Sequence, residues 1–383
     1  MPTGGCGRGW RGRSGGVSVD MSGKRLHHLQ ALRGIAASLV VLDHAVDSLV
    51  RYGDLSSDFS PLFWHLGDMG VSVFFVISGF IMMFTAGEDF AKAGATRKFL
   101  TKRLIRIVPL YWLATLLMFV MSGAWKRGAT GFSELAMSLM FIPYRGSTSG
   151  LIQPVLGQGW TLNYEVFFYI VFAVALMLRD KVGIILMSAL FAGLALMGLS
   201  MNFAGVSLGT AAVFYGNPIM MLFLAGVFVG WLYRRNPAML RFGHPFWLIS
   251  AIMALDVTGA VVFTSAVSSP IFVLAARILC IAAVTVCVFA ANTTEGFVER
   301  LSEMVGDGSY STYLFHTFLL AVMNRSIPTD GVVHGVIFVV LALLGANLAG
   351  YLCLRLLEKP LSQFLRSFVG LRPFGPAHDR KTP

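Results

Sequence analysis

Apolar stretches about 20 residues long recur along almost the whole chain, and they limit its fold more than any other feature. A membrane-spanning helix needs roughly 20 predominantly apolar residues. Hydrophobic residues make up 56% of the chain and charged residues only 13%, whereas a soluble domain usually has about 25% charged residues. We therefore predict an all-α polytopic membrane protein with a single membrane domain.

The apolar runs predict about ten transmembrane helices. They are expected at residues 29–50, 64–86, 104–123, 162–178, 183–200, 216–233, 245–264, 270–291, 310–326 and 333–356. The run "SELAMSLMFIP" (133–143) is too short to span a bilayer. We interpret it as an interfacial or re-entrant helix in the long 124–161 loop; counting it as a span would give eleven.

The lysines and arginines predict the orientation of these helices. If the N-terminus is cytoplasmic, the outside loops contain few basic residues, namely Arg51, Lys126, Arg127, Arg145 and Arg325. Basic residues favour the cytoplasmic side of a membrane, so both termini are predicted to be cytoplasmic. The net charge of +11 is explained by these loops, and the chain has no nucleic-acid motif. Nucleic acid is therefore not an expected partner.

Composition divides the chain into three parts. Residues 1–25 are rich in Gly, Arg and Ser and are predicted to be a disordered tail, with Met21 as an alternative start of the protein. Residues 26–365 form the membrane domain, and residues 366–383 form a cytoplasmic tail. The four cysteines do not occur in CxxC or mixed Cys/His spacings, so no metal site is expected.

The first predicted span contains four ionisable residues, Arg33, Asp43, His44 and Asp47. Burying such groups in a membrane is costly, and they usually mark functional sites. Eleven residues are about three helical turns, so Arg33 and His44 share a face, and Asp47 can reach His44 from the next turn. Asp43 points elsewhere. An imidazole oriented by a carboxylate suits a general base at neutral pH; Arg33 alone also fits a snorkelling anchor, and Asp47 a hydrated interface residue.

Three further segments place polar residues in or beside apolar runs. Arg103 and Arg106, in "KRLIRIVPLYW" (102–112), share a helical face, and such a pair fits either positive-inside flanking or an anion site for a cofactor with several phosphates. Glu165 opens one span, and His316 lies in another. Both fit acid–base work, while an interfacial Glu and a hydrogen-bonded core His are the simpler alternatives.

Six segments, in this order, resemble acyltransferase family 3. They are the Arg33–His44 pair, "GVSVFFVISGF" (70–80), "KRLIRIVPLYW" (102–112), "WTLNYEVFFY" (160–169), "GSYSTYLFH" (308–316) and "EKPLS" (358–362). The resemblance extends over about residues 26–365. It implies an integral membrane enzyme of the bacterial cytoplasmic (inner) membrane that O-acylates an exopolysaccharide, an O-antigen or a lipo-oligosaccharide.

The resemblance also implies a donor and roles for residues. Acetyl-CoA would bind from the cytoplasm with its phosphates near Arg103 and Arg106, and with Arg33 nearby. His44 would act as the base for the acceptor hydroxyl or as a transient acyl carrier. Glu165 and His316 are further acid–base candidates. Expected partners are the glycan or glycolipid acceptor, membrane lipid, and polysaccharide biosynthesis or export machinery; succinyl or longer acyl donors remain alternatives.

Two other classes of function are compatible with the sequence. In a proton-coupled transporter or flippase, His44, Asp47 and Glu165 would form a proton relay. The chain shows no internal repeat of the kind common in such transporters, and an arginine pair suits an anionic cofactor better than a proton path. A non-enzymatic subunit of a polysaccharide export complex is the third class, and it predicts that His44→Ala has no effect.

Overall fold

The computed structural model describes residues 27–204, 209–237, 245–262, 266–290 and 297–370. The predicted disordered tail therefore lies outside the described residues. All described helices belong to one compact unit, Leu26–Pro373. In chain order they are α1 (His27–Tyr52), η1 (Ser57–Phe59), α2 (Ser60–Ala86), α3 (Ala95–Met121), η2 (Ala124–Arg127), α4 (Ala129–Leu139), η3 (Gly157–Gly159), α5 (Trp160–Ala175), α6 (Asp180–Ala204), α7 (Thr210–Tyr215), η4 (Pro218–Met220), α8 (Met221–Arg235), α9 (Pro245–Val262), α10 (Pro270–Phe289), α11 (Phe297–Ser326), α12 (Gly331–Cys353), the π-helix η6 (Leu354–Glu358) and α13 (Lys359–Phe368).

The described part of the chain is helical and contains no β-strand, as the sequence predicts for an all-α membrane protein. Each of the ten predicted spans overlaps a helix, although the bounds and lengths of these helices differ from the prediction. Among the described residues, seven helical segments are long and apolar enough to cross a membrane: 28–52, 57–86, 95–121, 180–201, 218–235, 270–289 and 331–368. Helix α5 has only 16 residues and α9 is a shorter apolar helix, while α11 contains many polar residues. The count of ten therefore stays a prediction.

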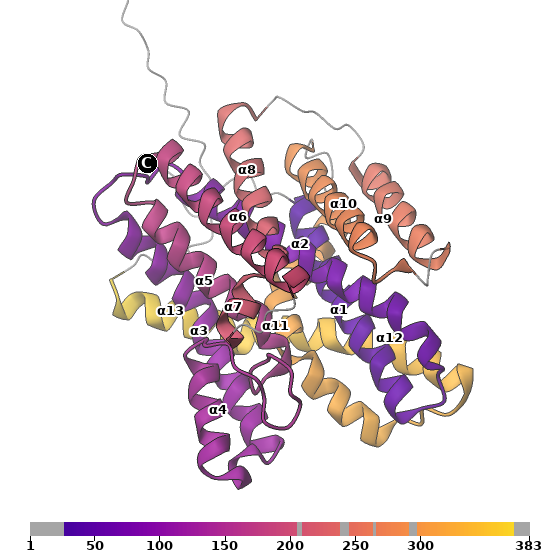
Figure 1. Cartoon of the computed structure of the whole chain (residues 1–383). Coiled ribbons are helices and arrows are strands. Elements are labelled where there is room, and N and C mark those ends of the chain that lie inside the picture. Colours follow the sequence, from indigo (N-terminus) through magenta and orange to yellow (C-terminus); the bar gives the residue numbers. More distant parts are fainter. Residues whose placement is uncertain (1–26, 205–208, 238–244, 263–265, 291–296, 371–383) are drawn as a thin grey trace, which may run out of the picture. The chain divides into compact units, whose positions relative to one another are not determined.

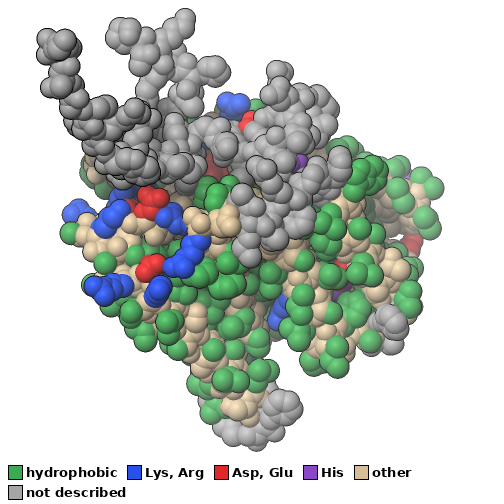
Figure 2. Space-filling model, turned by 90° about the horizontal axis from the view of Figure 1, so that it is seen from above, with side chains coloured by type: hydrophobic (Ala, Val, Ile, Leu, Met, Phe, Trp, Pro, Cys, Tyr) green, Lys and Arg blue, Asp and Glu red, His purple; other side chains and the backbone are tan. Residues whose placement is uncertain are grey.

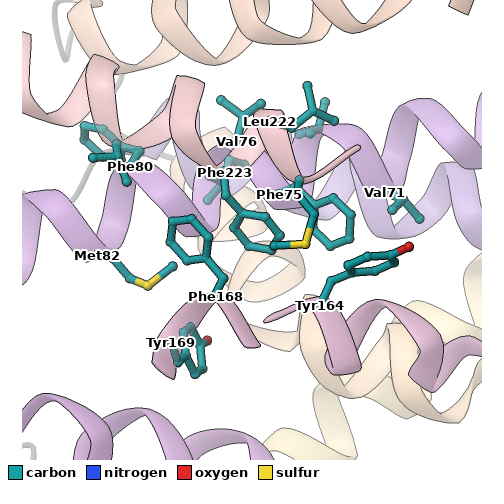
Figure 3. Packing of buried hydrophobic residues seen from close by; sticks show 14 of the residues in the cluster. Val71, Phe75, Val76, Phe80, Met82, Tyr164, Phe168, Tyr169, Leu222 and Phe223 are labelled. Atoms are coloured by element: carbon teal, nitrogen blue, oxygen red, sulfur yellow. The ribbon is translucent and has the colours of Figure 1, made fainter. Parts of the chain in front are cut away.

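Helix α2 packs against α8 at very short distance because glycines face the partner backbone. A Cβ on Gly79 would collide with the carbonyl oxygen of Phe223, and a Cβ on Gly226 with that of Val76. Around this contact, aromatic rings from α2, α5 and α8 fill the core, and the Phe75 and Phe223 rings stack with centroids 4.5 Å apart (Figure 3). Small residues allow the same close approach in other membrane helices.

Helix α1 lies between α2, α11 and α12 (Figure 1). Gly34 of α1 faces Val305, and Gly306 of α11 faces Gln30, so these two helices also approach closely. A second hydrophobic cluster joins α1, α11 and α12, with Val41, Ala45 and Phe338 fully buried. Helix α1 is therefore packed on several sides, and this packing orients the polar residues that it carries.

The segment expected to be interfacial or re-entrant (133–143) overlaps α4, which has 11 residues and is too short to span a bilayer. Buried Glu134 ties α4 to the loop that follows. Its carboxylate pairs with Arg127 at 2.7 Å and accepts the Ser147 amide at 2.7 Å. Burial alone would raise the pKa of the Glu134 carboxyl, but the Ser147 hydrogen bonds and the Arg127 charge outweigh burial and hold that pKa below its usual value.

The outer surface agrees with a membrane location. Figure 2 shows hydrophobic side chains over much of the surface that is not grey, with a cluster of lysines, arginines and acidic residues on the left and a few charged side chains elsewhere. Large exposed apolar side chains include Leu116 and Leu186 from two different helices. A surface so rich in apolar side chains is expected of helices that face lipid.

Candidate active site

Four of the predicted site residues meet in one cavity, and they come from three helices. Arg33 reaches it from α1, Arg103 and Arg106 from α3, and Glu165 from α5. The cavity has a volume of about 80 Å³, enough for several water molecules at roughly 10–15 Å³ each. Its other lining residues are Val71, Phe74, Phe75, Ile77, Ser78, Ile81, Ile107, Thr161, Leu162, Tyr169, Tyr310 and Tyr313.

Two hydroxyl groups hold the Glu165 carboxylate at the cavity wall. Ser78 donates a hydrogen bond to it from α2 at 3.1 Å. Tyr169, one turn further along α5, donates a second hydrogen bond to the same oxygen. Ser78 and Gly79 are neighbours in the chain but make different contacts, because Gly79 faces α8 while Ser78 faces Glu165.

The three arginines give this cavity an excess of positive charge. Arg33 is buried at 8% exposure and donates to Gln30 at 2.9 Å, which in turn donates to Asp307 at 3.3 Å. Arg103 donates to Thr85 at 3.2 Å and lies 5.8 Å from the Tyr169 ring centre. Guanidinium groups recognise phosphate and carboxylate groups well. The cavity can therefore hold an anionic group.

Another acidic group, Glu358, lies close to these arginines. Glu358, in the "EKPLS" segment, accepts a hydrogen bond from Ser311 of α11 at 2.6 Å, and it interacts electrostatically with Arg33 and Arg106. It lies in the π-helix that separates α12 from α13. Such helix irregularities are frequent at functional sites. The last of the resembling segments thus belongs to the same charged region.

His44 and His316 lie beside this cavity and touch each other. Their rings meet edge to face with centroids 4.9 Å apart. The ring of His316 lies 6.2 Å from that of Tyr313, which lines the cavity. His316 is 1% exposed and its Nε2 has no hydrogen-bond partner in the described structure. Three adjacent rings therefore connect the arginine-lined cavity to His44, whose side chain is 38% exposed.

Asp47 does not make the contact expected of it. It pairs instead with Arg51 at 2.8 Å, one turn further along α1, because a flexible arginine offers a closer cation than the His44 ring. Asp43, expected to point elsewhere, has its Oδ2 3.6 Å from His44 Nδ1. Adjacent residues can approach in this way when both side chains bend towards one side of the helix. The carboxylate beside His44 is therefore Asp43.

Several polar residues near the site escaped the sequence analysis. Tyr169 and Tyr310 line the cavity, and Asp256 and Arg277 lie within predicted spans. The rarity of ionisable residues inside membrane helices would have identified the last two. In the part of the chain that the structure describes, no group of three or more His, Cys, Asp or Glu side chains could hold a metal ion.

Comparisons with known proteins identify the family. The family model described as "Acyltransferase domain" matches residues 26–354. The chain is also 34% identical, over 310 residues, to the exopolysaccharide production protein ExoZ of Rhizobium meliloti (strain 1021), and the match covers 77% of this chain and 90% of ExoZ. No solved structure matches the chain.

Proposed function

We propose that this chain transfers an acetyl group from acetyl-CoA to a hydroxyl group of an exported glycan. The chain belongs to the acyltransferase family, whose model spans residues 26–354. The proposal depends on one observation above all. A single cavity gathers Arg33, Arg103, Arg106 and Glu165, and adjacent aromatic rings extend from it to His44.

The residues of the cavity fit the donor. Acetyl-CoA has phosphate groups that Arg103 and Arg106 would bind, with Arg33 behind them. When bound, the thioester supplies an activated acetyl group. The apolar and aromatic side chains around the arginines would exclude water and so protect the thioester from hydrolysis.

His44 fits the role of general base for the acceptor. Its Nδ1 lies 2.9 Å from the carbonyl oxygen of Val40, which can only accept a hydrogen bond. This contact places the proton on Nδ1 and leaves Nε2 free to take a proton from an acceptor hydroxyl. Glu165 and His316 would hold or move protons between the cavity and His44.

The acceptor follows from the relative. ExoZ is a protein of exopolysaccharide production, so we propose an exopolysaccharide in a bacterial inner membrane pathway as the first acceptor to test. An O-antigen or a lipo-oligosaccharide is the alternative acceptor. Family membership favours acyl transfer over a transporter, a flippase or a non-enzymatic export subunit.

The test compares the wild type with three variants in the native host lacking its own copy. The variants are His44→Ala, Arg106→Gln and His334→Ala, all matched for abundance in the membrane. Proton NMR of the purified surface polysaccharide, before and after mild alkali, measures its O-acetyl content. We expect acetate in the wild type and in His334→Ala, whose exposed histidine pairs with Asp330 away from the cavity.

We expect loss of acetate in His44→Ala, by about 100-fold or more if it is the general base. Arg106→Gln should raise the KM for acetyl-CoA by about tenfold in membrane vesicles, since a charged hydrogen bond contributes roughly 1.5–3 kcal/mol. Equal acetate in the wild type and His44→Ala would remove His44 from the mechanism. Unacetylated polysaccharide in the wild type, with altered export, would overturn the proposed function.

A further inference from the structure

A second group of buried ionisable residues lies outside the cavity described above. His65 Nε2 of α2 lies at hydrogen-bonding distance, 2.7 Å, from Asp256 Oδ2 of α9, and each side chain is only 2% exposed. Asp68, one turn after His65, interacts electrostatically with Arg277 of α10 and with His65. Burying so many charges in apolar helices is expensive, so this group calls for a role.

The group lies at the same level of the helices as His44. His65 and Asp68 are in the first turns of α2, and Arg277 is near the start of α10. Cys280, one turn after Arg277, donates its thiol hydrogen to the Met69 carbonyl at 3.8 Å, which ties α10 to α2 at this level. Helices α1, α2 and α10 contact one another.

Asp43 connects this group to His44. Its carboxylate packs directly on the backbone of α2 at Gly67, where a Cβ would come within 2.5 Å of Oδ2. Only glycine leaves that space. Asp43 also interacts electrostatically with Asp68, which follows Gly67 in the chain. The same Oδ2 atom lies 3.6 Å from His44 Nδ1, so the carboxylate is held between α2 and the His44 ring.

We infer that Asp43 is the carboxylate that stabilises the charged form of the His44 ring, and that Gly67 leaves the space in which this carboxylate lies against α2. The inference rests on the proposed function, in which His44 takes the acceptor proton on Nε2. As that proton moves from the hydroxyl oxygen to Nε2, the ring gains a positive charge. The nearby carboxylate stabilises that charge, while the Nδ1 proton stays hydrogen-bonded to Val40.

The charges around His44 support Asp43 in this role more than any other acidic group. On α1, Asp47 is engaged by Arg51. On α11, the neighbour is the ring of His316, which is not an acidic group. On α2, Asp68 acts on Asp43 and is itself close to Arg277 and His65. An opposite charge within about 4–6 Å of an ionisable group changes the pKa of that group by about one unit or more.

The test uses Asp43→Asn with Asp47→Asn as the matched control, because both are carboxylates of α1 and differ in their partner. The first measurement needs no acetyl donor. Diethyl pyrocarbonate reacts with neutral imidazole, and mass spectrometry of the His44 peptide gives the reaction rate at pH 6. Asp43→Asn should react about threefold faster than the wild type, since removing the carboxylate disfavours the imidazolium. Asp47→Asn should react like the wild type.

The second measurement is acetyl transfer as a function of pH. Asp43→Asn should lower kcat about tenfold, the equivalent of one pKa unit of charge stabilisation, and shift the acid limb of the pH profile. Asp43→Glu should recover part of the activity. Gly67→Ala, which displaces the carboxylate without removing it, should reproduce the faster His44 modification of Asp43→Asn.

Equal modification rates at His44 in the wild type and in Asp43→Asn would overturn the inference, whatever the enzyme does with acetyl-CoA. Loss of activity in Asp43→Asn with an unchanged pH profile would also contradict it, because that result indicates only structural damage. If His44 modification responds as expected while the wild type transfers no acetyl group, the Asp43–His44 coupling stands and the proposed function fails.

Discussion

The ring of His44 on α1 meets the ring of His316 on α11 edge to face, with centroids 4.9 Å apart. The two residues are 272 positions apart in the chain, so only the packing of α1 against α11 brings them together. That packing depends on Gly34 and Gly306, whose partners on the opposite helix leave no room for a Cβ. The site therefore contains a histidine pair, with His316 between His44 and the cavity.

Replacing His316 tests whether it takes part in proton transfer with His44 or only packs against the His44 ring. Its Nδ1 donates to the Tyr313 carbonyl at 2.7 Å, and its Nε2 has no partner among the described residues. His316→Asn can keep the Nδ1 hydrogen bond but removes Nε2. We expect acetyl transfer to fall by about 100-fold, as for loss of a proton-transfer group.

His316→Phe serves as the comparison because it keeps a ring against His44 and removes both nitrogens. Both variants should lose activity if Nε2 carries protons. Retained activity in His316→Phe, measured with radiolabelled acetyl-CoA in membrane vesicles, would show that the ring only packs.

The contribution of Glu165 to acetyl transfer should decrease when either of its two hydroxyl hydrogen-bond donors is removed, and decrease further when its own carboxylate is removed. Tyr169→Phe and Ser78→Ala each remove one hydrogen bond to the carboxylate, and a hydrogen bond to a charged group contributes roughly 1.5–3 kcal/mol. We expect each to lower kcat by about tenfold, and Glu165→Gln to lower it further. Thr85→Ala, which removes only a partner of Arg103, should affect the KM for acetyl-CoA instead of kcat. Equal kcat in Glu165→Gln and the wild type would remove Glu165 from acid–base work.

Much of the helical layout could be predicted from the sequence because apolar length is a local property. The ten predicted spans each overlap a helix, and the short segment at 133–143 overlaps the short helix α4. The sequence also singled out Arg33, Arg103, Arg106 and Glu165, which share one cavity. Each of these residues interrupts an apolar run or occurs at its edge, so its cost in a membrane was visible without a structure.

The partners of these residues could not be predicted in the same way. Helical spacing favoured Asp47 over Asp43 as the neighbour of His44, but it takes no account of Arg51, which holds Asp47. It also gives no information about Gly67, which makes room for Asp43 from another helix. Contacts between helices depend on how each helix is rotated about its axis and on how closely two helices approach. The periodicity of a single helix gives no information about either.

The contact between α2 and α8 should be very sensitive to added volume. Gly226→Ala would place a methyl group against the Val76 carbonyl and 2.8 Å from the Phe80 nitrogen. Overpacking of this kind costs about 1–3 kcal/mol, and here backbone atoms must move. We expect a lower unfolding temperature in detergent, measured with a thiol-reactive dye that reports the exposure of buried Cys280 and Cys287.

Gly193→Ala on α6 is the matched control for this substitution. No atom lies within 4 Å of the position where its Cβ would be, and alanine favours helix by about 1 kcal/mol over glycine. Its unfolding temperature should be equal to or above that of the wild type. Equal unfolding temperatures in Gly226→Ala and Gly193→Ala would mean that α2 and α8 can move apart at little cost to admit the added methyl group.

The loop after α4 should lose its protection from hydrogen exchange at low pH. Glu134 is buried and bound by Arg127 and the Ser147 amide, and its pKa is lowered. A carboxyl group with a lowered folded pKa adds stability above its unfolded pKa, about 4.3 for Glu. That stability is lost as the pH falls through the folded pKa. Glu134→Gln should remove it at neutral pH.

Hydrogen–deuterium exchange of residues 140–156, corrected for the intrinsic pH dependence of exchange, measures this effect. At pH 7 we expect exchange in Glu134→Gln to be roughly 5- to 150-fold faster, equivalent to the 1–3 kcal/mol cost of an unsatisfied buried partner. The difference should shrink below about pH 4. Glu88→Gln is the control, because Glu88 is 76% exposed in its pair with Arg234 and such surface pairs contribute little. A difference between Glu134→Gln and the wild type that persists unchanged to pH 3 would show that the shape of the side chain, and not its charge, holds the loop.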